Sequence, residues 1–191
     1  MKIKVGINGM GRIGRMVLRS LIENNDKDII IKHINSRSNS NVVASLLKYD
    51  SVHGKLKCNI SHDKNHLIIN KKKITFSQFT NLNEINWKKY DVDYVFECTG
   101  KFNSKDKLLS HIKNGAKKVI VSAPCKNADK TIVFGVNQKN LNKKDKIISA
   151  ASCTTNCLAP LASVINNDFK ILSGFMTTIH AFTTDQRLLD N

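Results

Sequence analysis

A glycine-rich turn between a strand pattern and a helix pattern constrains the fold of this chain more than any other feature. Gly9, Gly11 and Gly14 form a G-x-G-x-x-G motif that follows the apolar run Ile3 to Asn8 and precedes the helical pattern Arg12 to Glu23. In such a turn the first glycine permits a tight bend, the second lets the backbone approach a pyrophosphate, and the third lets helix and strand pack closely. Amide groups at the start of the helix face the phosphates. The motif predicts a dinucleotide-binding unit; the alternative is a tight packing turn without a ligand.

Short β-branched runs alternate with longer polar or helical stretches as far as Ser149. This alternation is typical of an α/β fold with a mostly parallel sheet. A further helix is expected over Ser104 to Lys113, capped by Ser104, and antiparallel strands are expected between Leu56 and Phe76. The runs expected to form the parallel strands are Ile3 to Asn8, Ile29 to Ile34, Tyr94 to Glu97, Val119 to Val121, Thr131 to Phe134 and Ile147 to Ser149.

The pattern changes after Ser149. Ser152 to Asn166 is expected to be helical, and Ile171 to His180 is strand-like. We therefore expect a Rossmann-type dinucleotide-binding domain over residues 1–151 and the beginning of a different unit over residues 152–191.

The composition is that of a soluble globular protein. The 191 residues are 41% hydrophobic and 24% charged. No apolar run reaches the roughly 18 to 20 residues of a membrane span, and the first six residues lead into a strand pattern, unlike a signal peptide. The five cysteines form no C-x-x-C pair, which favours a reducing, cytoplasmic location without a disulfide framework or a metal site.

The net charge of +16 raises nucleic acid as a partner, because lysine and arginine neutralise phosphates. The lysines are scattered at turns between apolar segments, and aromatic residues make up only 6% of the chain. A nucleic-acid surface would need clustered charge beside stacking rings. A solvated, lysine-rich surface is therefore the favoured interpretation.

One cysteine stands out chemically. Ser152 is a natural N-cap and places Cys153 in the first turn of the expected helix, where the helix dipole favours a thiolate. Cys153 is a candidate nucleophile, whereas Cys157 and the remaining cysteines are interpreted as small buried side chains. His180 is a candidate base, because a Cys/His pair brought together by the fold activates a thiol; its alternative is a structural role.

The end of the second expected strand departs from the usual NAD pattern. An NAD enzyme normally carries an acidic residue there for the ribose 2′-hydroxyl, and this chain has no acidic residue until Asp50. Ser36 can donate a hydrogen bond and Arg37 supplies positive charge, and neither repels a 2′-phosphate. NADP, or use of both cofactors, is therefore favoured.

Six segments together resemble the glyceraldehyde-3-phosphate dehydrogenase family. The Ser-Cys-Thr-Thr-Asn-Cys block is the most specific of them, and the match runs from the first residue to the last. The segments are Asn8 to Arg15, Leu46 to Gly54, Glu97 to Gly100, Ser122 to Pro124, Ser152 to Cys157 and Thr177 to His180.

The resemblance implies phosphorylating oxidation of glyceraldehyde 3-phosphate to 1,3-bisphosphoglycerate with NAD(P), through a thiohemiacetal and a thioester on Cys153. His180 would ionise the thiol and act as general acid and base, with the Cys153 N–H group completing an oxyanion site. Ser152 and Thr154 would hold the attacking inorganic phosphate, and Thr183 the substrate phosphate. The cofactor-binding residues that it implies are Asn8, Gly9, Gly11, Arg12, Ile13, Ser36, Arg37, Thr99, Gly100 and Ser122.

Departures from the family pattern bear on the cofactor. Ser36 replaces the usual Asp, Asn191 falls where NAD-specific members tend to carry Leu, and Thr80 stands where the family often has Arg near the adenine. The first two changes weaken the case for strict NAD use.

A typical family member is nearly twice as long, so we expect an incomplete chain with only the beginning of an α+β catalytic domain. Alone it is expected to be inactive; when complete, the resemblance implies a cytoplasmic homotetramer of glycolysis, gluconeogenesis or carbon fixation, with no membrane partner. The rival readings are an erythrose-4-phosphate dehydrogenase and a non-catalytic fragment that binds a dinucleotide or a nucleic acid.

Overall fold

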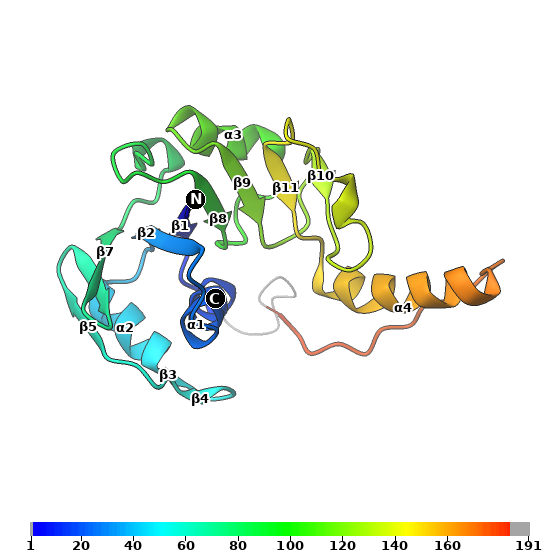
Figure 1. Ribbon diagram of the computed structural model, residues 1–191, viewed down its shortest axis with the longest axis horizontal. Helices are drawn as coiled ribbons and strands as arrows, with labels where there is room; N and C mark the ends of the chain where they lie inside the picture. Colours follow the sequence, from blue (N-terminus) through cyan, green and yellow to red (C-terminus); the bar gives the residue numbers. More distant parts are fainter. Residues whose placement is uncertain (1, 184–191) are drawn as a thin grey trace.

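The computed structural model describes residues 2–183 and contains a nine-stranded sheet with helices on both faces (Figure 1). The strand order is β10-β11-β9-β8-β1-β2-β7-β6-β5. The strands of this sheet are β1 Ile3–Asn8, β2 Ile29–Asn35, β5 Ile60–Asp63, β6 His66–Ile69, β7 Lys72–Ser77, β8 Tyr94–Glu97, β9 Lys118–Val121, β10 Lys130–Thr131 and β11 Ile147–Ser149. The helices are α1 Arg12–Glu23, α2 Ser40–Lys48, α3 Lys105–Lys113 and α4 Cys153–Phe169, with 3-10 turns at Leu82–Glu84 and Gln138–Asn140.

Seven of these strands are parallel, and the order reverses between β1 and β8. From β1 the chain winds one way through β2 and β7, and the other way through β8, β9, β11 and β10. In an open α/β sheet, a ligand binds outside the carboxyl ends of the strands at the point of reversal. The topology therefore predicts a ligand site at the carboxyl ends of β1 and β8.

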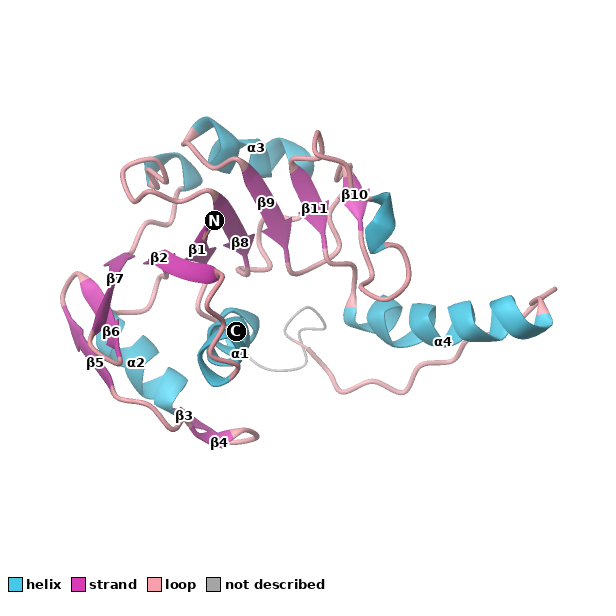
Figure 2. Ribbon diagram, in the orientation of Figure 1, coloured by secondary structure: helices cyan, strands magenta, loops and turns pink. Residues whose placement is uncertain are grey.

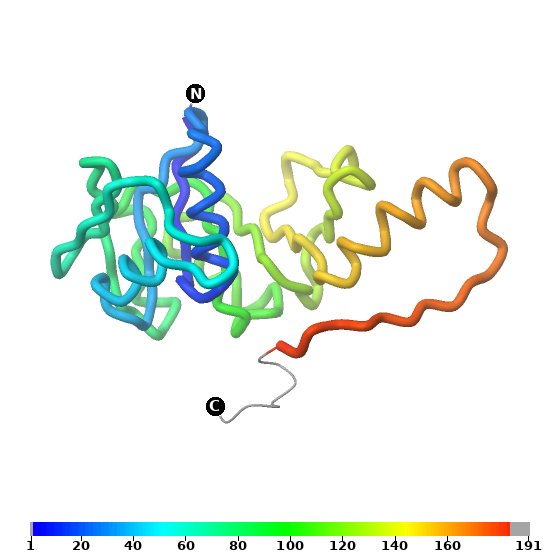
Figure 3. Tube along the Cα trace, turned by 90° about the horizontal axis from the view of Figure 1, so that it is seen from below, coloured from blue at the N-terminus to red at the C-terminus, as the bar shows by residue number. Residues whose placement is uncertain are grey.

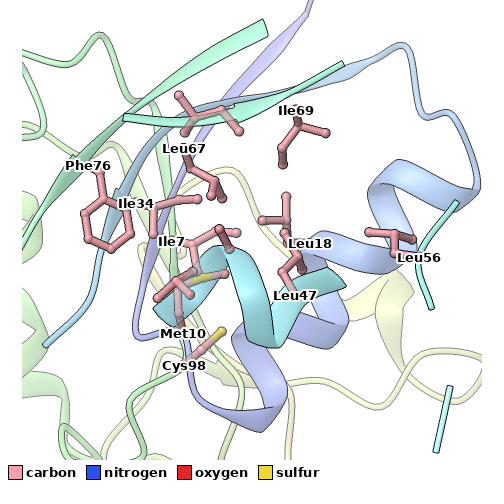
Figure 4. Packing of buried hydrophobic residues seen from close by; sticks show 13 residues of the cluster. Ile7, Met10, Leu18, Ile34, Leu47, Leu56, Leu67, Ile69, Phe76 and Cys98 are labelled. Carbon is pink, nitrogen blue, oxygen red and sulfur yellow. The ribbon is translucent and has the colours of Figure 1, made fainter. Parts of the chain in front are cut away.

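Helices lie on both faces of the sheet (Figure 2), and an apolar cluster on each face holds them there. On one face α1 and α2 pack on β1, β2 and the antiparallel strands, with Leu18, Leu47 and Ile34 among the buried side chains (Figure 4). On the other face α3 packs on β8 and β9, and the cluster includes Leu108 and the fully buried Trp87. Both faces of the central strands are thus covered, which explains their near-continuous apolar sequences.

Most expected elements are confirmed, with four differences. The segment from Leu56 to Phe76 contains β5, β6 and most of β7, and β6 pairs antiparallel with both of the others, as expected. Helix α2 was not foreseen. The strand expected over Thr131 to Phe134 is reduced to Lys130–Thr131, and a turn follows. Ser104 occupies the N-cap of α3, but its side chain makes no capping hydrogen bond.

The strand expected over Ile171 to His180 is wrong. Residues 170–183 lie in no helix or strand and run back beside α4 toward its first turn (Figure 3). Their apolar side chains are exposed, and no strand of the described residues pairs with them. The β-branched composition of the segment is typical of a strand, but a strand also needs a neighbouring strand to share its backbone hydrogen bonds.

Within residues 2–183, no helix has the length and apolar character needed to cross a membrane.

Candidate functional site

The glycine turn joins β1 to α1 at the point where the strand order reverses. Gly9 has a φ of 95°, a conformation that side chains disfavour, and a Cβ there would lie 2.8 Å from the Thr99 backbone nitrogen. A Cβ on Gly14 would lie 2.0 Å from the Gly9 carbonyl oxygen, whereas a Cβ on Gly11 would meet nothing within 4 Å. Gly9 and Gly14 are therefore required by close packing, and Gly11 leaves open space over the helix N-terminus, where a phosphate fits.

The contrast between these glycines gives a stability prediction. We expect Gly14→Ala to lower the free energy of unfolding by about 2 kcal/mol or more, since the added methyl group overlaps the Gly9 carbonyl. Gly11→Ala is the matched control, and its free energy of unfolding should stay within about 0.5 kcal/mol of the wild type. Urea denaturation measures both, and equal stability of the two variants would contradict this assignment of roles.

A pocket of about 350 Å³ lies at the carboxyl ends of β1, β2 and β8. It is lined by six of the expected cofactor residues, together with Asn35, Phe79, Thr80 and other neighbours. The six are Asn8, Gly9, Gly11, Ser36, Arg37 and Thr99. The fold therefore gathers the glycine turn and the expected ribose position on one cavity.

The charge of this pocket is entirely positive. Arg15, Arg37 and Lys101 line it, and no aspartate or glutamate does. Ser36 is buried, with its N–H group donating to the Ser77 carbonyl at 3.0 Å, so β7 fixes its position. The pocket suits a polyanion, because three cations face it and no fixed negative charge opposes them.

Four expected cofactor residues do not line the pocket. Arg12 forms an ion pair with Asp50, and Ile13 is exposed. Backbone hydrogen bonds, first that from His53, and the Arg12 guanidinium hold the pKa of Asp50 well below its usual range. The other two, Gly100 and Ser122, lie along the same edge of the sheet but outside the cavity.

Several lining residues were missed by sequence reasoning. Arg15 lies four residues after Gly11, so both share one side of α1, and this spacing was a usable signal. Phe79 reaches the pocket because β7 pairs with β2, a non-local contact that the sequence did not reveal.

The candidate nucleophile lies at the N-terminus of α4. Ala151 has a φ of 62°, which turns the chain from β11 into the helix, and this left-handed residue was not foreseen. The Ser152 hydroxyl accepts a hydrogen bond from the Thr155 N–H group at 3.0 Å, which confirms the expected N-cap. Cys153 therefore stands in the first turn, exposed, with the helix dipole favouring its thiolate.

The segment that runs back along α4 brings His180 to this cysteine. Cys153 Sγ and His180 Nε2 are 3.0 Å apart, although 27 positions separate them in the chain. His180 Nδ1 donates to the Ala181 carbonyl, which leaves Nε2 to exchange a proton with the sulfur. The distance alone makes this a Cys/His pair of the kind that activates a thiol.

The electrostatics of the pair favour its ionised form. The hydrogen bond from His180 is the largest cause that lowers the pKa of the Cys153 thiol. The pKa of His180 is raised, first by its hydrogen bond to the Ala181 carbonyl and then by Cys153. Both shifts stabilise a thiolate beside an imidazolium.

The expected phosphate ligands flank this pair. Ser152 is half-buried and Thr154 lies in the first turn of α4, where an anion is favoured. Thr183 is the last described residue, three positions after His180. The Ser152 hydroxyl is also 2.7 Å from the Thr155 hydroxyl. A bound anion would therefore share the Ser152 hydroxyl with the capping interaction.

Comparison with known proteins accounts for this arrangement. Residues 3–105 match the family described as "Glyceraldehyde 3-phosphate dehydrogenase, NAD binding domain", and residues 152–191 match the C-terminal domain of the same family. Glyceraldehyde-3-phosphate dehydrogenase 2 of Bacillus subtilis is 48% identical over 192 residues, which cover 100% of this chain and 56% of that protein. The enzyme of Geobacillus stearothermophilus is 48% identical over the same shares, and that of Mycoplasma pneumoniae 47% identical over 98% of this chain and 56% of its own length.

The chain spans about half the length of the curated relatives it matches. The N-terminal match alone covers more than half of the chain, and it contains the glycine turn and the pocket. With the second match over the Cys153 and His180 segment, the chain belongs to the glyceraldehyde 3-phosphate dehydrogenase family.

Proposed function

We propose that the protein oxidises glyceraldehyde 3-phosphate and phosphorylates the product, using NAD or NADP and Cys153 as the nucleophile. The observation that carries this proposal is the 3.0 Å contact between Cys153 Sγ and His180 Nε2 at a helix N-terminus. In the same proposal residues 1–151 are the dinucleotide-binding domain, and residues 152–191 begin the catalytic domain.

The chemistry divides one hard oxidation into two steps. The Cys153 thiolate adds to the aldehyde carbon, and His180 gives its proton to the carbonyl oxygen, so that a thiohemiacetal forms. The Cys153 N–H group, in the first turn of α4, stabilises charge on that oxygen during the addition.

His180 then works in the opposite direction. Its Nε2 atom removes the hydroxyl proton as the carbon loses hydride, and a thioester remains on Cys153. Inorganic phosphate, held by Ser152 and Thr154, attacks the thioester carbon, and the C–S bond breaks. The acyl phosphate leaves and Cys153 is again a thiolate, while Thr183 holds the substrate phosphate.

The pocket residues fit a dinucleotide. Open space at Gly11 over the N-terminus of α1 accepts the pyrophosphate, and Arg15 and Lys101 supply positive charge. Asn8 and Thr99 line the cavity on the strands that face the reversal point. When bound there, the oxidised nicotinamide supplies the hydride acceptor.

We further propose that NADP is accepted at least as well as NAD. Ser36 gives no carboxylate to repel a 2′-phosphate, and the Arg37 guanidinium makes no ion pair among residues 2–183. In this proposal the full-length protein is a cytoplasmic homotetramer, and its only other ligands are the aldehyde and inorganic phosphate.

The direct test is phosphate-dependent turnover. The chain is fused to the remaining part of the Bacillus subtilis relative, and formation of reduced cofactor is followed with glyceraldehyde 3-phosphate, with and without inorganic phosphate. We expect turnover that requires phosphate and is faster than with erythrose 4-phosphate, and little turnover by the 191-residue chain alone, which lacks part of the site that holds the substrate.

The Cys153→Ser fusion is the matched control and should be inactive while it still binds the dinucleotide. Turnover that survives this substitution, or that needs no phosphate, would contradict the proposed function.

A further inference from the structure

A buried carboxylate lies beneath the dinucleotide pocket without a cationic partner. Glu97, the last residue of β8, is 1% exposed and does not line the pocket, so it cannot touch a ligand there. Among residues 2–183 it pairs with no lysine or arginine, and its only ion-pair contact is the ring of His111. A buried carboxylate is costly unless hydrogen bonds satisfy both of its oxygens.

Every neighbour of the carboxylate is a donor. Oε1 accepts from the N–H and hydroxyl groups of Thr99, at 2.9 Å for the N–H group, and Oε2 accepts from Asn8 Nδ2 at 2.6 Å. Trp87 Nε1 can only donate, so His111 Nδ1 accepts from it at 2.8 Å, and His111 Nε2 therefore carries a proton and donates to Oε2 at 2.9 Å. The two carboxyl oxygens of Glu97 thus accept from four donors, two on each oxygen.

This charge dictates the orientation of two amides in the next strands. Asn8 must point its Nδ2 at Glu97, so its Oδ1 faces Asn35 and accepts from Asn35 Nδ2 at 2.8 Å. Asn35 Oδ1 is then placed to accept from the Phe79 N–H group at 2.9 Å, while its Nδ2 also donates to the Phe79 carbonyl at 2.9 Å. Glu97 at one end can only accept and the Phe79 N–H at the other can only donate, so only one direction of donation satisfies the whole line.

The two ends of the line are both walls of the pocket, one after β8 and the other after β7, with β1 and β2 between these strands in the sheet. At one end, the Thr99 hydroxyl donates to Glu97 and accepts from the Lys101 N–H group at 3.2 Å, and both residues line the cavity. At the other end, Asn35 holds Phe79, which lines the cavity next to Ser36. Chains of hydrogen bonds polarise one another, so a change at one end is felt at the other.

We propose that Glu97 is a positioning residue of the dinucleotide site, whose buried carboxylate holds the two walls of the pocket in place through Asn8 and Asn35. The proposal rests on the proposed function for the identity of the ligand. Glutamine at position 97 presents an N–H group to a neighbour that can only donate, either the Thr99 N–H or His111. Two changes would relieve this donor–donor clash. One wall of the pocket moves, or the side-chain amides of Asn8 and Asn35 both flip, which turns the Asn35 Nδ2 group toward the Phe79 N–H group.

The first test uses the 191-residue chain with Glu97→Gln and ADP as the probe. We expect the dissociation constant for ADP to rise about fivefold, the size of a typical coupling between sites, although Glu97 does not line the pocket. Amide hydrogen exchange at Phe79 should quicken by about tenfold, because its N–H group loses a properly oriented acceptor. Ser149→Ala is the matched control, since Ser149 is equally buried and its hydroxyl donates to the Ala123 carbonyl outside this line; it should change neither quantity.

A second variant keeps the proposal falsifiable if Glu97→Gln fails to fold. In Asn8→Asp two carboxyl groups face each other and share one proton at low pH, which preserves the direction of donation, whereas at high pH both ionise and repel. Because Asn8 itself lines the pocket, the test compares two pH values within each protein: from about pH 6 to about pH 9 the affinity of Asn8→Asp for ADP should fall at least fivefold more than that of the wild type.

The outcomes separate the two proposals. Wild-type chain that binds neither ADP nor NAD contradicts the proposed function, and exchange at Phe79 still decides the role of Glu97. Wild-type binding, with unchanged ADP affinity and unchanged Phe79 exchange in the folded variants, overturns the role of Glu97 and leaves the proposed function standing.

Discussion

Brief treatment of the folded chain with iodoacetamide at about pH 6.5 should label Cys153 first, about tenfold faster than Cys157 and on the order of a hundredfold faster than Cys98. The reactive species is the thiolate, and the hydrogen bond from His180 lowers the pKa of Cys153. Burial raises the pKa of Cys98 to about 12 and also raises the pKa values of Cys58 and Cys125. Peptide mapping of the labelled protein measures the five rates.

The pH dependence has a definite sign. As the pH falls, the Cys153 thiolate persists until the pH passes below its lowered pKa, so its labelling rate should fall at lower pH than that of an ordinary thiol. As the pH rises through the raised pKa of His180, the imidazolium loses its proton, and its positive charge no longer stabilises the Cys153 thiolate. His180→Asn should therefore slow the alkylation of Cys153 by about tenfold at pH 6.5 and by much less at pH 9.

His62→Asn is the matched control, because His62 is exposed on β5, away from Cys153. It should leave every rate unchanged. Labelling of Cys58 or Cys125 ahead of Cys153 would show that the assignment of the nucleophile is wrong.

The elements that the sequence predicted well are those whose signals are local. The helix Arg12 to Glu23 and the strands Ile3 to Asn8, Tyr94 to Glu97 and Ile147 to Ser149 have the expected bounds. Each combines a clear period with a glycine or polar boundary, so that local preference and tertiary packing agree. The run at Ile171 to His180 had the composition of a strand, but its pairing depends on a neighbour that lies elsewhere, and composition does not encode that.

The candidate site divides in the same way. The helix cap at Ser152 and the placement of Cys153 follow from residues next to each other, whereas the approach of His180 depends on the path of the intervening 26 residues. The line from Glu97 to Phe79 joins three strands and the loop after β7, and spacing along the sequence could not reveal it. Its residues are ordinary by themselves, and only the sheet order makes them neighbours.

Replacing Ser36 by aspartate should shift the preference of the chain from NADP toward NAD by at least tenfold, about 1.4 kcal/mol. The new carboxylate would stand in a pocket whose charged lining residues are otherwise all cationic, where it can accept hydrogen bonds from the ribose hydroxyls and repel a 2′-phosphate. The ratio of the two dissociation constants, measured by titration, reports the shift. Arg37→Ala should weaken the binding of NADP about fivefold and leave the binding of NAD nearly unchanged, because only NADP offers a 2′-phosphate to the guanidinium.

Ser61→Asp introduces the same charge at an exposed position of β5, so it separates a local effect at the ribose from a general change in net charge. A long-range effect would weaken both cofactors together and vanish in added salt, because exposed charges are screened within about 10 Å. The position of Ser36, fixed by its backbone bond to Ser77 on β7, argues for the local effect. An unchanged ratio in Ser36→Asp, with Ser61→Asp behaving alike, would mean that the ribose does not reach this wall of the pocket, and the placement of the cofactor along β2 would have to be revised.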